Sequence, residues 1–396
     1  MSPKKLFFIA GEPSGDVQGA CLLSEFKQRC PGIACRGIGG ALMAQAGMDL
    51  IHDLAKEAAL GLGDVLRKYL LFYNAFHKAL REVESFRPDA VILIDFPGFN
   101  LRFAKKINKR WPVIYYISPQ IWAWGKRRLE TIRRTVDHMI VFFQFEAELY
   151  EKAGVPVTWV GHPLLDVPES RVPRGQLRSQ WLHGSSREAK LVALLPGSRE
   201  SEVRRILPEM LRASELLHAR MPHVQFLLSE ANSLPTSLYD PLMRNTQPSC
   251  PIQRVRNQSF EILHASDFAL VSSGTATLEA TVAGTPFLIL YKTAWSTFFL
   301  GRRLIKIPYI GLVNVVAGRK IVPEFIQHGI RTDAVAQEGS YLLESQDLRE
   351  KMISDLKAVR EQLGEPGAAR RAARVVLEFL NVEAAAPALP AAACMK

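Results

Sequence analysis

Short apolar segments alternate with helix-length amphipathic segments along nearly the whole of this 396-residue chain. The apolar segments are rich in Val, Ile, Leu and Phe and have no clean period of two, which is typical of strands buried on both faces of a parallel sheet. Their alternation with helices predicts a doubly wound α/β fold. The predicted strands cover 6–10, 90–94, 113–117, 138–142 and 157–160 in a first series, and 191–195, 224–228, 268–271 and 287–290 in a second.

The segment 166–189 separates the two series and has the composition of a linker, with two prolines, two glycines and many charged residues. We therefore predict a first domain over 1–165 and a second over 190–365. A helix over 366–381 and a disordered tail over 382–396 are expected to follow. Because ligands bind beyond the carboxyl ends of the strands in such sheets, we expect one cleft between the two domains. That arrangement suits a reaction between two substrates and equally suits a two-domain binding protein.

The chain is basic, with 50 Lys and Arg residues against 39 Asp and Glu residues and a formal charge of +11. This excess favours nucleic acid, phosphorylated small molecules or an acidic membrane surface as partners. The basic residues lie in small scattered groups, which argues against nucleic acid. Five cysteines without Cys-x-x-Cys or zinc spacing indicate reduced thiols. Since no segment reaches the ~18 apolar residues of a membrane span, we expect a soluble or surface-attached protein.

The first motif, GEPSGD at 11–16, follows a predicted strand and opens a predicted helix. Gly11 and Gly15 permit a tight turn, and Ser14 or Asp16 can cap the helix. The free N–H groups at the start of the helix would attract an anion, although a plain capped turn explains the motif equally well. The motif matches neither the GxGxxG pattern nor the Walker loop, which argues against NAD and ATP.

A carboxylate ends the predicted strand 90–94, because Asp95 follows it and Pro97 and Gly98 then break the strand. A side chain at this end of a strand faces the ligand site of an α/β domain. Low-dielectric surroundings would raise the pKa of Asp95 towards that of a useful general base. The alternative is that Asp95 caps the following loop.

Two tryptophans lie in the motif SPQIWAWG at 118–125, directly after another predicted strand. Trp122 and Trp124 are suited to stack on a sugar or an acyl chain. The alternative is that both pack in the core, where most tryptophans lie.

The motif LLPGSRESEV at 194–203 repeats the pattern of strand, turn and helix in the second domain. Gly197 and Ser198 open the helix, and Arg199 adds a guanidinium beside its free N–H groups. This combination predicts a cradle for a diphosphate.

A loop of small residues, SSGTATLEA at 272–280, opens a further helix. Its N–H groups and the hydroxyls of Ser273, Thr275 or Thr277 suit phosphate oxygens, and Glu279 can accept both hydroxyls of a ribose. Alternatively the loop only caps the helix and Glu279 belongs to a capping box. We favour ligand binding, because two anion cradles in one domain match one nucleoside diphosphate.

No Asp-x-Asp pair is present to hold magnesium, so we predict a reaction without a metal or cofactor.

The segment 60–76 is apolar and aromatic, with Arg67 and Lys68 in its middle. Such a stretch can lie in a membrane interface or form the buried face of a helix.

Taken together, these motifs resemble the lipid-A-disaccharide synthase family. The motifs that carry the resemblance are, in order, GEPSGD, IDFPGFN, SPQIWAW, GHP at 161–163, LLPGSRESEV, SSGTATLE and LVNVVAGR at 312–319. They span residues 11 to 319. One departure is Val313, where the family pattern has proline before Asn314.

The resemblance implies two Rossmann-like domains of the GT-B type, with C-terminal helices that pack on the first domain or on a partner chain in a homodimer. It implies transfer of 2,3-diacylglucosamine from UDP to 2,3-diacylglucosamine 1-phosphate, giving a β-1,6 disaccharide and UDP. The expected location is the cytoplasmic face of the inner membrane of a Gram-negative bacterium. The membrane contacts would be 60–76 and 295–300, with Arg302 and Arg303 beside the latter.

By motif matching, the resemblance also implies functional residues. Asp95 would be the essential acid, Arg199 the diphosphate arginine and Asn314 a further catalytic-site residue. His162 either touches the ligand or is a satisfied turn histidine. The substrate-binding residues that we predict are Gly11, Glu12, Ser14, Gly15, Asp16, Gln120, Trp122, His162, Gly197, Ser198, Glu202, Ser273, Gly274, Thr275, Ala276 and Glu279.

Other functions are compatible with parts of this pattern. One is a different UDP-sugar enzyme, such as a peptidoglycan N-acetylglucosaminyltransferase or a UDP-sugar epimerase. Another is a nucleotide-sugar binder without catalysis. A nucleic-acid module is disfavoured, because no continuous basic stripe with interleaved aromatic residues is present.

Overall fold

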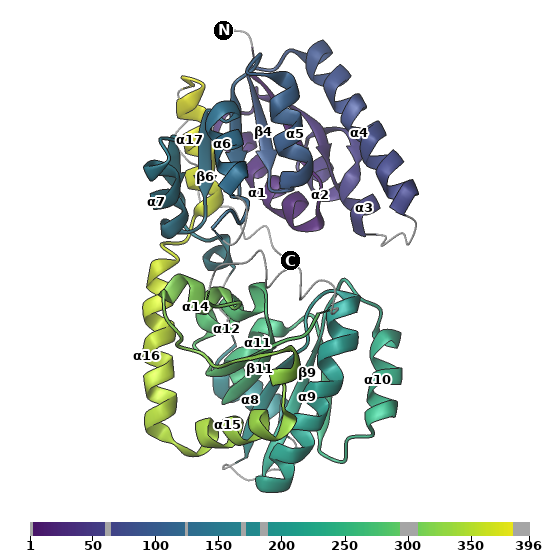
Figure 1. Cartoon of the computed structure of the whole chain (residues 1–396), viewed down its shortest axis with the longest axis vertical. Coiled ribbons are helices and arrows are strands. Elements are labelled where there is room, and N and C mark those ends of the chain that lie inside the picture. The colour runs from purple at the N-terminus through teal and green to yellow at the C-terminus, as the bar shows by residue number, and fades with distance from the viewer. Residues whose placement is uncertain are drawn as a thin grey trace. The chain divides into compact units, whose positions relative to one another are not determined.

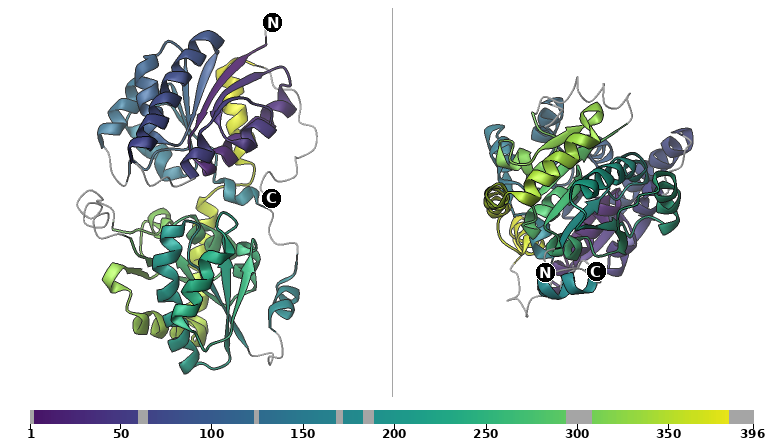
Figure 2. Two further views of the ribbon diagram at one scale, coloured as in Figure 1. Left: turned by 90° about the vertical axis from the view of Figure 1, so that its right-hand side faces the viewer. Right: turned by 90° about the horizontal axis from the view of Figure 1, so that it is seen from below.

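The computed structural model describes residues 3–59, 65–122, 126–167, 172–182, 189–293 and 308–382 (Figure 1). By internal contacts the chain divides into two compact units. The first comprises Met1–Val167 together with Leu363–Lys396, and the second comprises Pro168–Gln362. Each unit is a parallel sheet with helices on both faces (Figure 2), which confirms the predicted α/β class.

A seven-stranded sheet forms the centre of the first unit, in the order β3-β2-β1-β4-β5-β6-β7. Its strands are β1 (Lys5–Ala10), β2 (Ala34–Gly39), β3 (Asp49–Asp53), β4 (Ala90–Ile94), β5 (Val113–Tyr116), β6 (His138–Val141) and β7 (Val157–Trp159). Its helices are α1 (Pro13–Arg29), α2 (Ala41–Gln45), α3 (Leu54–Ala59), α4 (Val65–Phe86), α5 (Pro97–Ile107), α6 (Lys126–Thr135), α7 (Gln144–Lys152), the 3-10 helix η1 (Pro163–Asp166) and α17 (Ala368–Phe379). Phe8 on β1 lies opposite Ile92 on β4, and all of β4 is fully buried, which explains its unbroken apolar sequence.

The second unit has a six-stranded sheet in the order β10-β9-β8-β11-β12-β13. Its strands are β8 (Lys190–Leu195), β9 (Val224–Glu230), β10 (Ile252–Arg256), β11 (Phe268–Ser272), β12 (Phe287–Tyr291) and β13 (Glu324–Ile326). Its helices are α8 (Arg174–Trp181), α9 (Glu200–Arg220), η2 (Thr236–Leu238), α10 (Tyr239–Thr246), α11 (Ser259–Ala265), α12 (Thr275–Ala283), α14 (Leu312–Ala317), η3 (Gln327–Gly329), α15 (Thr332–Glu344) and α16 (Gln346–Gln362). Leu270 on β11 pairs with Leu194 on β8 at the buried centre of this sheet.

The strand order changes direction between β1 and β4 in the first sheet and between β8 and β11 in the second. In open α/β sheets, ligands bind beyond the carboxyl ends of the strands at such a switch point. Gly11 follows β1, Asp95 follows β4, Pro196 follows β8 and Ser273 follows β11. The fold therefore places two of the predicted motifs at the switch point of each unit.

All nine predicted strands are present, and four further strands were missed, namely β2, β3, β10 and β13. The missed strands contain many partly exposed residues, as in the sequences DLIHD of β3 and IQRVR of β10. Since β3, β10 and β13 lie at sheet edges, they need no continuous apolar run.

Part of 166–189, where we expected a linker, forms helix α8 in the second unit. Leu177 and Trp181 are four residues apart, so they share one face of this helix, and both are buried in the core of that unit. The short helix was overlooked because charged residues surround these two apolar positions.

Helix α17 belongs to the first unit, where it packs against α1. Asp166 caps its start by accepting hydrogen bonds from the N–H groups of Gly367 and Ala368. The expected tail lies outside the described residues from 383 onwards. Within the described part of the chain, no helix combines the length and the apolar character that a membrane span requires.

Candidate functional site

Asp95 lies in a backbone turn that tertiary hydrogen bonds hold in place. Asp95 and Phe96 have left-handed φ angles of 45° and 47°, which residues with a side chain rarely adopt. The carbonyl of Asp95 accepts hydrogen bonds from the Tyr115 hydroxyl at 2.6 Å and the Asn100 amide at 2.7 Å. Its N–H donates to the carbonyl of Tyr116 at 2.9 Å. The turn thereby fixes the direction of the Asp95 side chain at the end of β4.

The Asp95 carboxyl is half-buried, and its surroundings make it a stronger base than an ordinary aspartate. Desolvation raises the pKa of Asp95 to about 6, repulsion by Glu12 adds to the rise, and a hydrogen bond from the N–H of Phe96 opposes it. Helix α5 begins without a side-chain cap, so capping does not account for Asp95. A carboxylate with a pKa near 6 is ionised at neutral pH and can accept a proton in a reaction.

If Asp95 serves as the base of a reaction, its pKa predicts an acid limb in the pH profile of that reaction. Because Asp95 must be ionised to accept a proton, kcat/KM should fall about tenfold for each pH unit below about pH 6. Steady-state rates between pH 4.5 and 8 would measure this limb. A rate that stays constant down to pH 4.5 would remove Asp95 from the role of base.

The turn at Gly11 lies against the turn at Asp95. A Cβ atom on Gly11 would overlap the Phe96 ring, so only glycine fits at this position. Helix α1 begins after Glu12 with no side-chain cap, and Ser14 is exposed in its first turn. Gly15 lies beside Ile94 at the end of β4, where a Cβ atom on Gly15 would make an ordinary van der Waals contact. The predicted residues around Gly11 and Asp95 therefore lie together.

The hydrogen-bond partners of Asp16 were not predicted from the sequence. We expected it to cap α1 or bind substrate, but its carboxylate is buried and caps α2 instead. It accepts hydrogen bonds from the N–H groups of Gly40, Leu42 and Met43 at 3.0–3.1 Å. Because these bonds occupy the carboxylate, its structural role is to join α1 to α2.

In the motif at 118–125, Trp122 is half-buried and its indole N–H donates to the Glu146 carboxylate at 3.2 Å. The Trp122 ring also contacts Phe145 edge to face, with 5.6 Å between the ring centroids. Burial raises the pKa of Glu146 to about 8, so its protonated form is stabilised. Gln120 is exposed, whereas Trp124 lies outside the described residues.

His162 is held by contacts within the first unit. Its Nδ1 accepts the N–H of Leu164 at 3.1 Å, and its ring packs against Phe142 and Phe143. Burial lowers the pKa of His162 to about 4, so the ring is neutral at pH 7. These contacts fit the alternative of a turn histidine, with Nδ1 occupied by the backbone of the turn.

In the second unit, Gly197 and Arg199 form the turn between β8 and α9. Gly197 has a φ of 111°, and a Cβ on it would come within 2.6 Å of the Glu202 carboxylate. The Arg199 side chain is 76% exposed, and its ion pair with Glu202 at 3.2 Å is solvated. Since exposed ion pairs contribute about 0–1 kcal/mol, Arg199 is free to turn towards an anionic ligand. Ser198 is exposed beside it.

The loop after β11 presents hydroxyl and N–H groups at the start of α12. Gly274 precedes this helix without a side-chain cap, and Thr275 is exposed next to Ala276. The Ser273 hydroxyl donates to the carbonyl of Ile310 at 3.3 Å. Thr277, in contrast, is buried and bonded to the carbonyl of Gly274, so its hydroxyl does not face a ligand.

Glu279, in the helix that follows this loop, is an acceptor that the described residues leave unused. It is half-buried, and burial raises its pKa. No described residue donates a hydrogen bond to it, so the capping box that we considered is not formed. A desolvated carboxylate gains most from a ligand that supplies hydrogen-bond donors, such as the two hydroxyls of a ribose.

Asn314, which we predicted to be catalytic, has no contact with solvent in the structure. Its side chain is 0% exposed. The amide nitrogen donates to the carbonyl of Val322 and to the Glu324 carboxylate, both at 2.8 Å. The amide oxygen accepts the N–H groups of Ile321 and Val322. All four hydrogen-bonding positions of the Asn314 side chain are therefore occupied by neighbouring protein groups.

Glu324 connects Asn314 to the loop after β11. Its carboxylate accepts the N–H groups of Ile310 and Gly311 at 3.0 and 2.9 Å. Ile310 in turn accepts the Ser273 hydroxyl. Val313, at the family's proline position, packs fully buried in the core at the start of α14.

Sequence analysis missed four residues that support this site, namely Asn100, Tyr115, Glu146 and Glu324. Asn100 lies inside a motif that we singled out, so its polar side chain after a buried strand was an available signal. Tyr115 looks like an ordinary strand residue, and its role depends on contact with a strand neighbour.

Comparison with known proteins identifies the family of the chain. The family model described as lipid-A-disaccharide synthetase matches residues 6–379. The lipid-A-disaccharide synthase of Syntrophus aciditrophicus is 42% identical over 383 residues, covering 96% of this chain and 99% of that protein. The lipid-A-disaccharide synthase of Coxiella burnetii is 38% identical over 377 residues, which cover 95% of this chain and 98% of that protein.

Solved structures of low identity share the fold. A putative UDP-N-acetylglucosamine 2-epimerase from Listeria monocytogenes has a TM-score of 0.65 at 13% identity, covering 98% of this chain and 100% of its own. The calicheamicin glycosyltransferase CalG4 has a TM-score of 0.59 at 15% identity, covering 96% and 99%. At such identities the likeness establishes architecture only. On the family match and the near-complete alignment with its members, the chain belongs to the lipid-A-disaccharide synthetase family.

Proposed function

We propose that this chain is an inverting glycosyltransferase that makes the lipid A disaccharide. It transfers 2,3-diacylglucosamine from UDP to the 6-hydroxyl of 2,3-diacylglucosamine 1-phosphate, forming a β-1,6 disaccharide 1-phosphate and UDP. The observation that carries this proposal is the Asp95 carboxyl, held at a switch point with its pKa raised to about 6. Arg199 and Glu279 at the second switch point support it as groups suited to a nucleoside diphosphate.

The stereochemistry of the reaction requires one base. The donor sugar is α-linked to the diphosphate and the product is β-linked, so the acceptor oxygen displaces UDP in a single inversion. The bond from the anomeric carbon to the phosphate oxygen breaks as the bond to the acceptor oxygen forms. Asp95 takes the proton of the acceptor hydroxyl.

The leaving group needs stabilisation of its growing negative charge. Arg199 and the uncapped starts of α9 and α12 offer a guanidinium and free N–H groups for the departing UDP. We propose that Glu279 binds the ribose and that these groups take the role that a metal ion has in other nucleotide-sugar enzymes.

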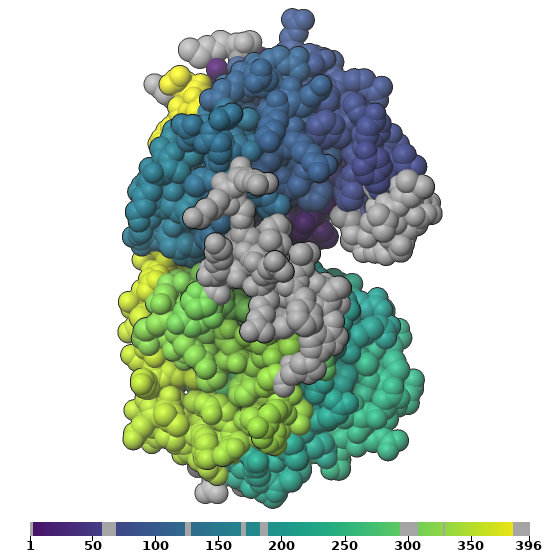
Figure 3. Space-filling model, viewed as in Figure 1, coloured from purple at the N-terminus to yellow at the C-terminus, as the bar shows by residue number. Residues whose placement is uncertain are grey.

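Both substrates carry acyl chains, so we further propose peripheral contact with the cytoplasmic face of the inner membrane. Helix α4 lies at the outer surface of the first unit (Figure 3) and exposes Tyr69, Leu70 and Tyr73 by 62%, 52% and 50%. The two tyrosine rings stack with 6.3 Å between their centroids. Exposed aromatic and apolar side chains on one helix suit a membrane interface. Of the other predicted contacts, 60–64 and 294–307 lie outside the described residues.

Replacing Leu70 by glutamate should weaken this membrane contact. The change places a charge among apolar groups and repels anionic headgroups, so binding to anionic vesicles should fall at least about tenfold. Sedimentation with phosphatidylglycerol vesicles at low and high salt would measure it. Leu216→Glu on α9, where Leu216 is 38% exposed, is the matched control. Equal binding by both variants would contradict contact through α4.

Mass spectrometry of the products tests the proposed reaction itself. The chain would be incubated with UDP-2,3-diacylglucosamine and the acceptor monosaccharide phosphate, and in parallel with UDP-N-acetylglucosamine, which lacks the acyl chains. We expect a disaccharide 1-phosphate and UDP only with the acylated donor. A transfer product or an epimer from UDP-N-acetylglucosamine would point to a different UDP-sugar enzyme, and no turnover with either donor would leave a binding protein.

A further inference from the structure

A recess of about 360 Å³ lies at the amino ends of β8, β11 and β12 in the second unit. It is at the opposite edge of the sheet from Arg199 and Ser273, which follow the carboxyl ends of β8 and β11. Because these parallel strands are five or six residues long, the two edges are about 15–20 Å apart. The ionisable residues that line the recess are Arg174, Lys190, His264, Asp267 and Arg349.

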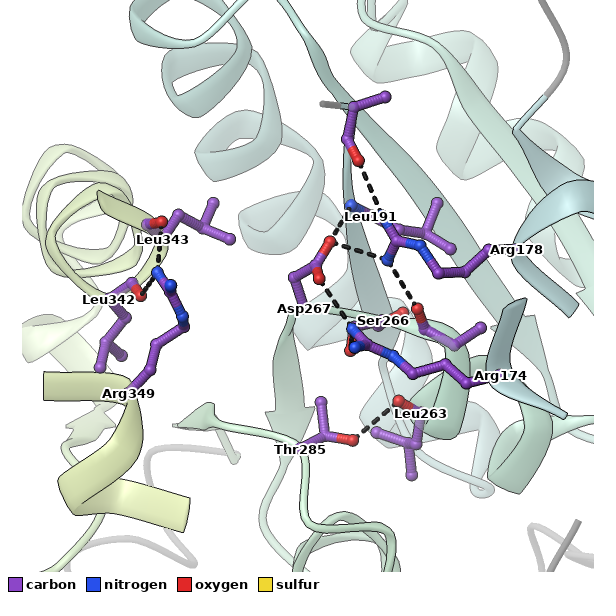
Figure 4. A network of polar contacts seen from close by, with 12 residues as sticks. Arg174, Arg178, Leu191, Leu263, Ser266, Asp267, Thr285, Leu342, Leu343 and Arg349 are labelled. Carbon is purple, nitrogen blue, oxygen red and sulfur yellow. Dashed lines mark hydrogen bonds and ion pairs between the residues drawn. The ribbon is translucent and has the colours of Figure 1, made fainter. Parts of the chain in front are cut away.

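Among the described residues that line the recess, Asp267 carries the one carboxylate, and it is already neutralised by partners. Asp267 accepts hydrogen bonds from Arg174 at 2.7 Å, from Arg178 at 2.9 Å and from the N–H of Leu191 at 2.9 Å (Figure 4). Arg178 also donates to the carbonyls of Ala265 and Ala189, which ties α8 to the sheet. Asp267 therefore has little capacity left to balance another cation.

The cations around the recess carry more positive charge than the Asp267 carboxylate balances. The ammonium group of Lys190 makes no hydrogen bond or ion pair with any residue that the structure describes. On the other side of the recess, Arg349 uses one nitrogen to bind the carbonyls of Leu342 and Leu343 at the end of α15 (Figure 4). Since a carbonyl carries no full charge, none of the described residues balances the guanidinium charge of Arg349.

The arrangement of the cations around the recess favours an anion with several acceptor oxygens. The cations lie on three separate elements, so their N–H donors approach from different directions. A phosphate group has several acceptor oxygens and fits such an arrangement. Ala283, Pro286 and Ile353 add apolar lining. The volume also exceeds that of a bare ion and lies within the range of small-molecule sites.

We propose that this recess is a second anion site that binds an organic phosphate, remote from the groups proposed for the transfer reaction. Lys190, Arg174 and Arg349 hold the phosphate, and the apolar lining holds the organic part. The same chemistry is presented by a soluble phosphomonoester and by the headgroup of an anionic phospholipid. The two sources differ in whether the ligand arrives free in solution or in a bilayer.

Chemical protection of Lys190 tests the site directly. The full chain, saturated with UDP to fill the nucleotide site, would be treated with an amine-acetylating ester, and the acetylation of single lysines followed by mass spectrometry. Glycerol 3-phosphate or phosphatidylglycerol vesicles should slow acetylation of Lys190 at least about fivefold. Lys351 is exposed two residues after Arg349 and so lies on another face of α16, and its acetylation should not change.

A charge-removing variant supplies the second measurement. Where glycerol 3-phosphate protects Lys190, calorimetry with UDP present should show that Lys190→Gln binds it at least about tenfold more weakly than the wild type, whereas Lys351→Gln should bind it equally well. Protection by glycerol 3-phosphate would assign a soluble ligand, and protection by vesicles alone would assign a lipid headgroup. Protection by neither, or equal protection of Lys190 and Lys351, would overturn the site.

Discussion

Asp95→Asn is expected to lower turnover by at least ~10²-fold while leaving the affinity for UDP nearly unchanged. Asparagine keeps the size and shape of the side chain but cannot accept the acceptor's proton. The turn should survive, because its hydrogen bonds from Tyr115 and Asn100 go to the backbone carbonyl of residue 95. Single-turnover rates with the acylated donor would report the loss, and calorimetry with UDP would report the affinity.

A matched control separates loss of the base from a general effect of removing one carboxylate. Asp347→Asn changes an exposed aspartate on α16 and should leave turnover unchanged. The pH profile adds a further check, since the acid limb near pH 6 should disappear in Asp95→Asn if this residue causes it. Near-normal turnover of Asp95→Asn would show that another group removes the proton.

The places of Asp95, Arg199 and Glu279 beyond the ends of strands could be predicted from the sequence, because strand ends are local features. Asp95, Arg199 and Glu279 each follow an apolar strand and a break, and parallel strands collect such residues at one edge of the sheet. The polar edge strands β3 and β10 were not predicted, because they lack such a local signal. Their residues are partly exposed and have no apolar run to detect.

The roles of Asp16 and Asn314 could not be predicted in the same way. The three N–H groups that Asp16 accepts lie 24 to 27 residues further along the chain, and nothing in its own motif points to them. Asn314 is bound by the segment that returns beside it at Ile321 and Val322. A polar residue in a functional motif can contact the substrate or can hold other residues of the site in place. Only the tertiary contacts of the residue distinguish these two roles.

Arg199→Ala should weaken UDP binding about 10- to 100-fold and lower turnover as well. The charge-assisted hydrogen bonds that a guanidinium makes to a diphosphate are worth about 1.5–3 kcal/mol, and every 1.4 kcal/mol is a factor of ten in affinity. Folding should be unaffected, because the Arg199 side chain is 76% exposed and its one ion pair is solvated. Calorimetry with UDP measures the affinity, and thermal unfolding without ligand verifies the fold.

Arg204→Ala is the matched control for the effect of Arg199→Ala on UDP binding. Arg204 lies on the same helix, is exposed, and pairs with Glu200 much as Arg199 pairs with Glu202. The two variants therefore remove the same charge and a similar ion pair, but only Arg199 stands at the start of α9 beside the free N–H groups. Equal UDP affinity in both variants would mean that overall charge attracts the nucleotide and that the turn after β8 does not hold its diphosphate.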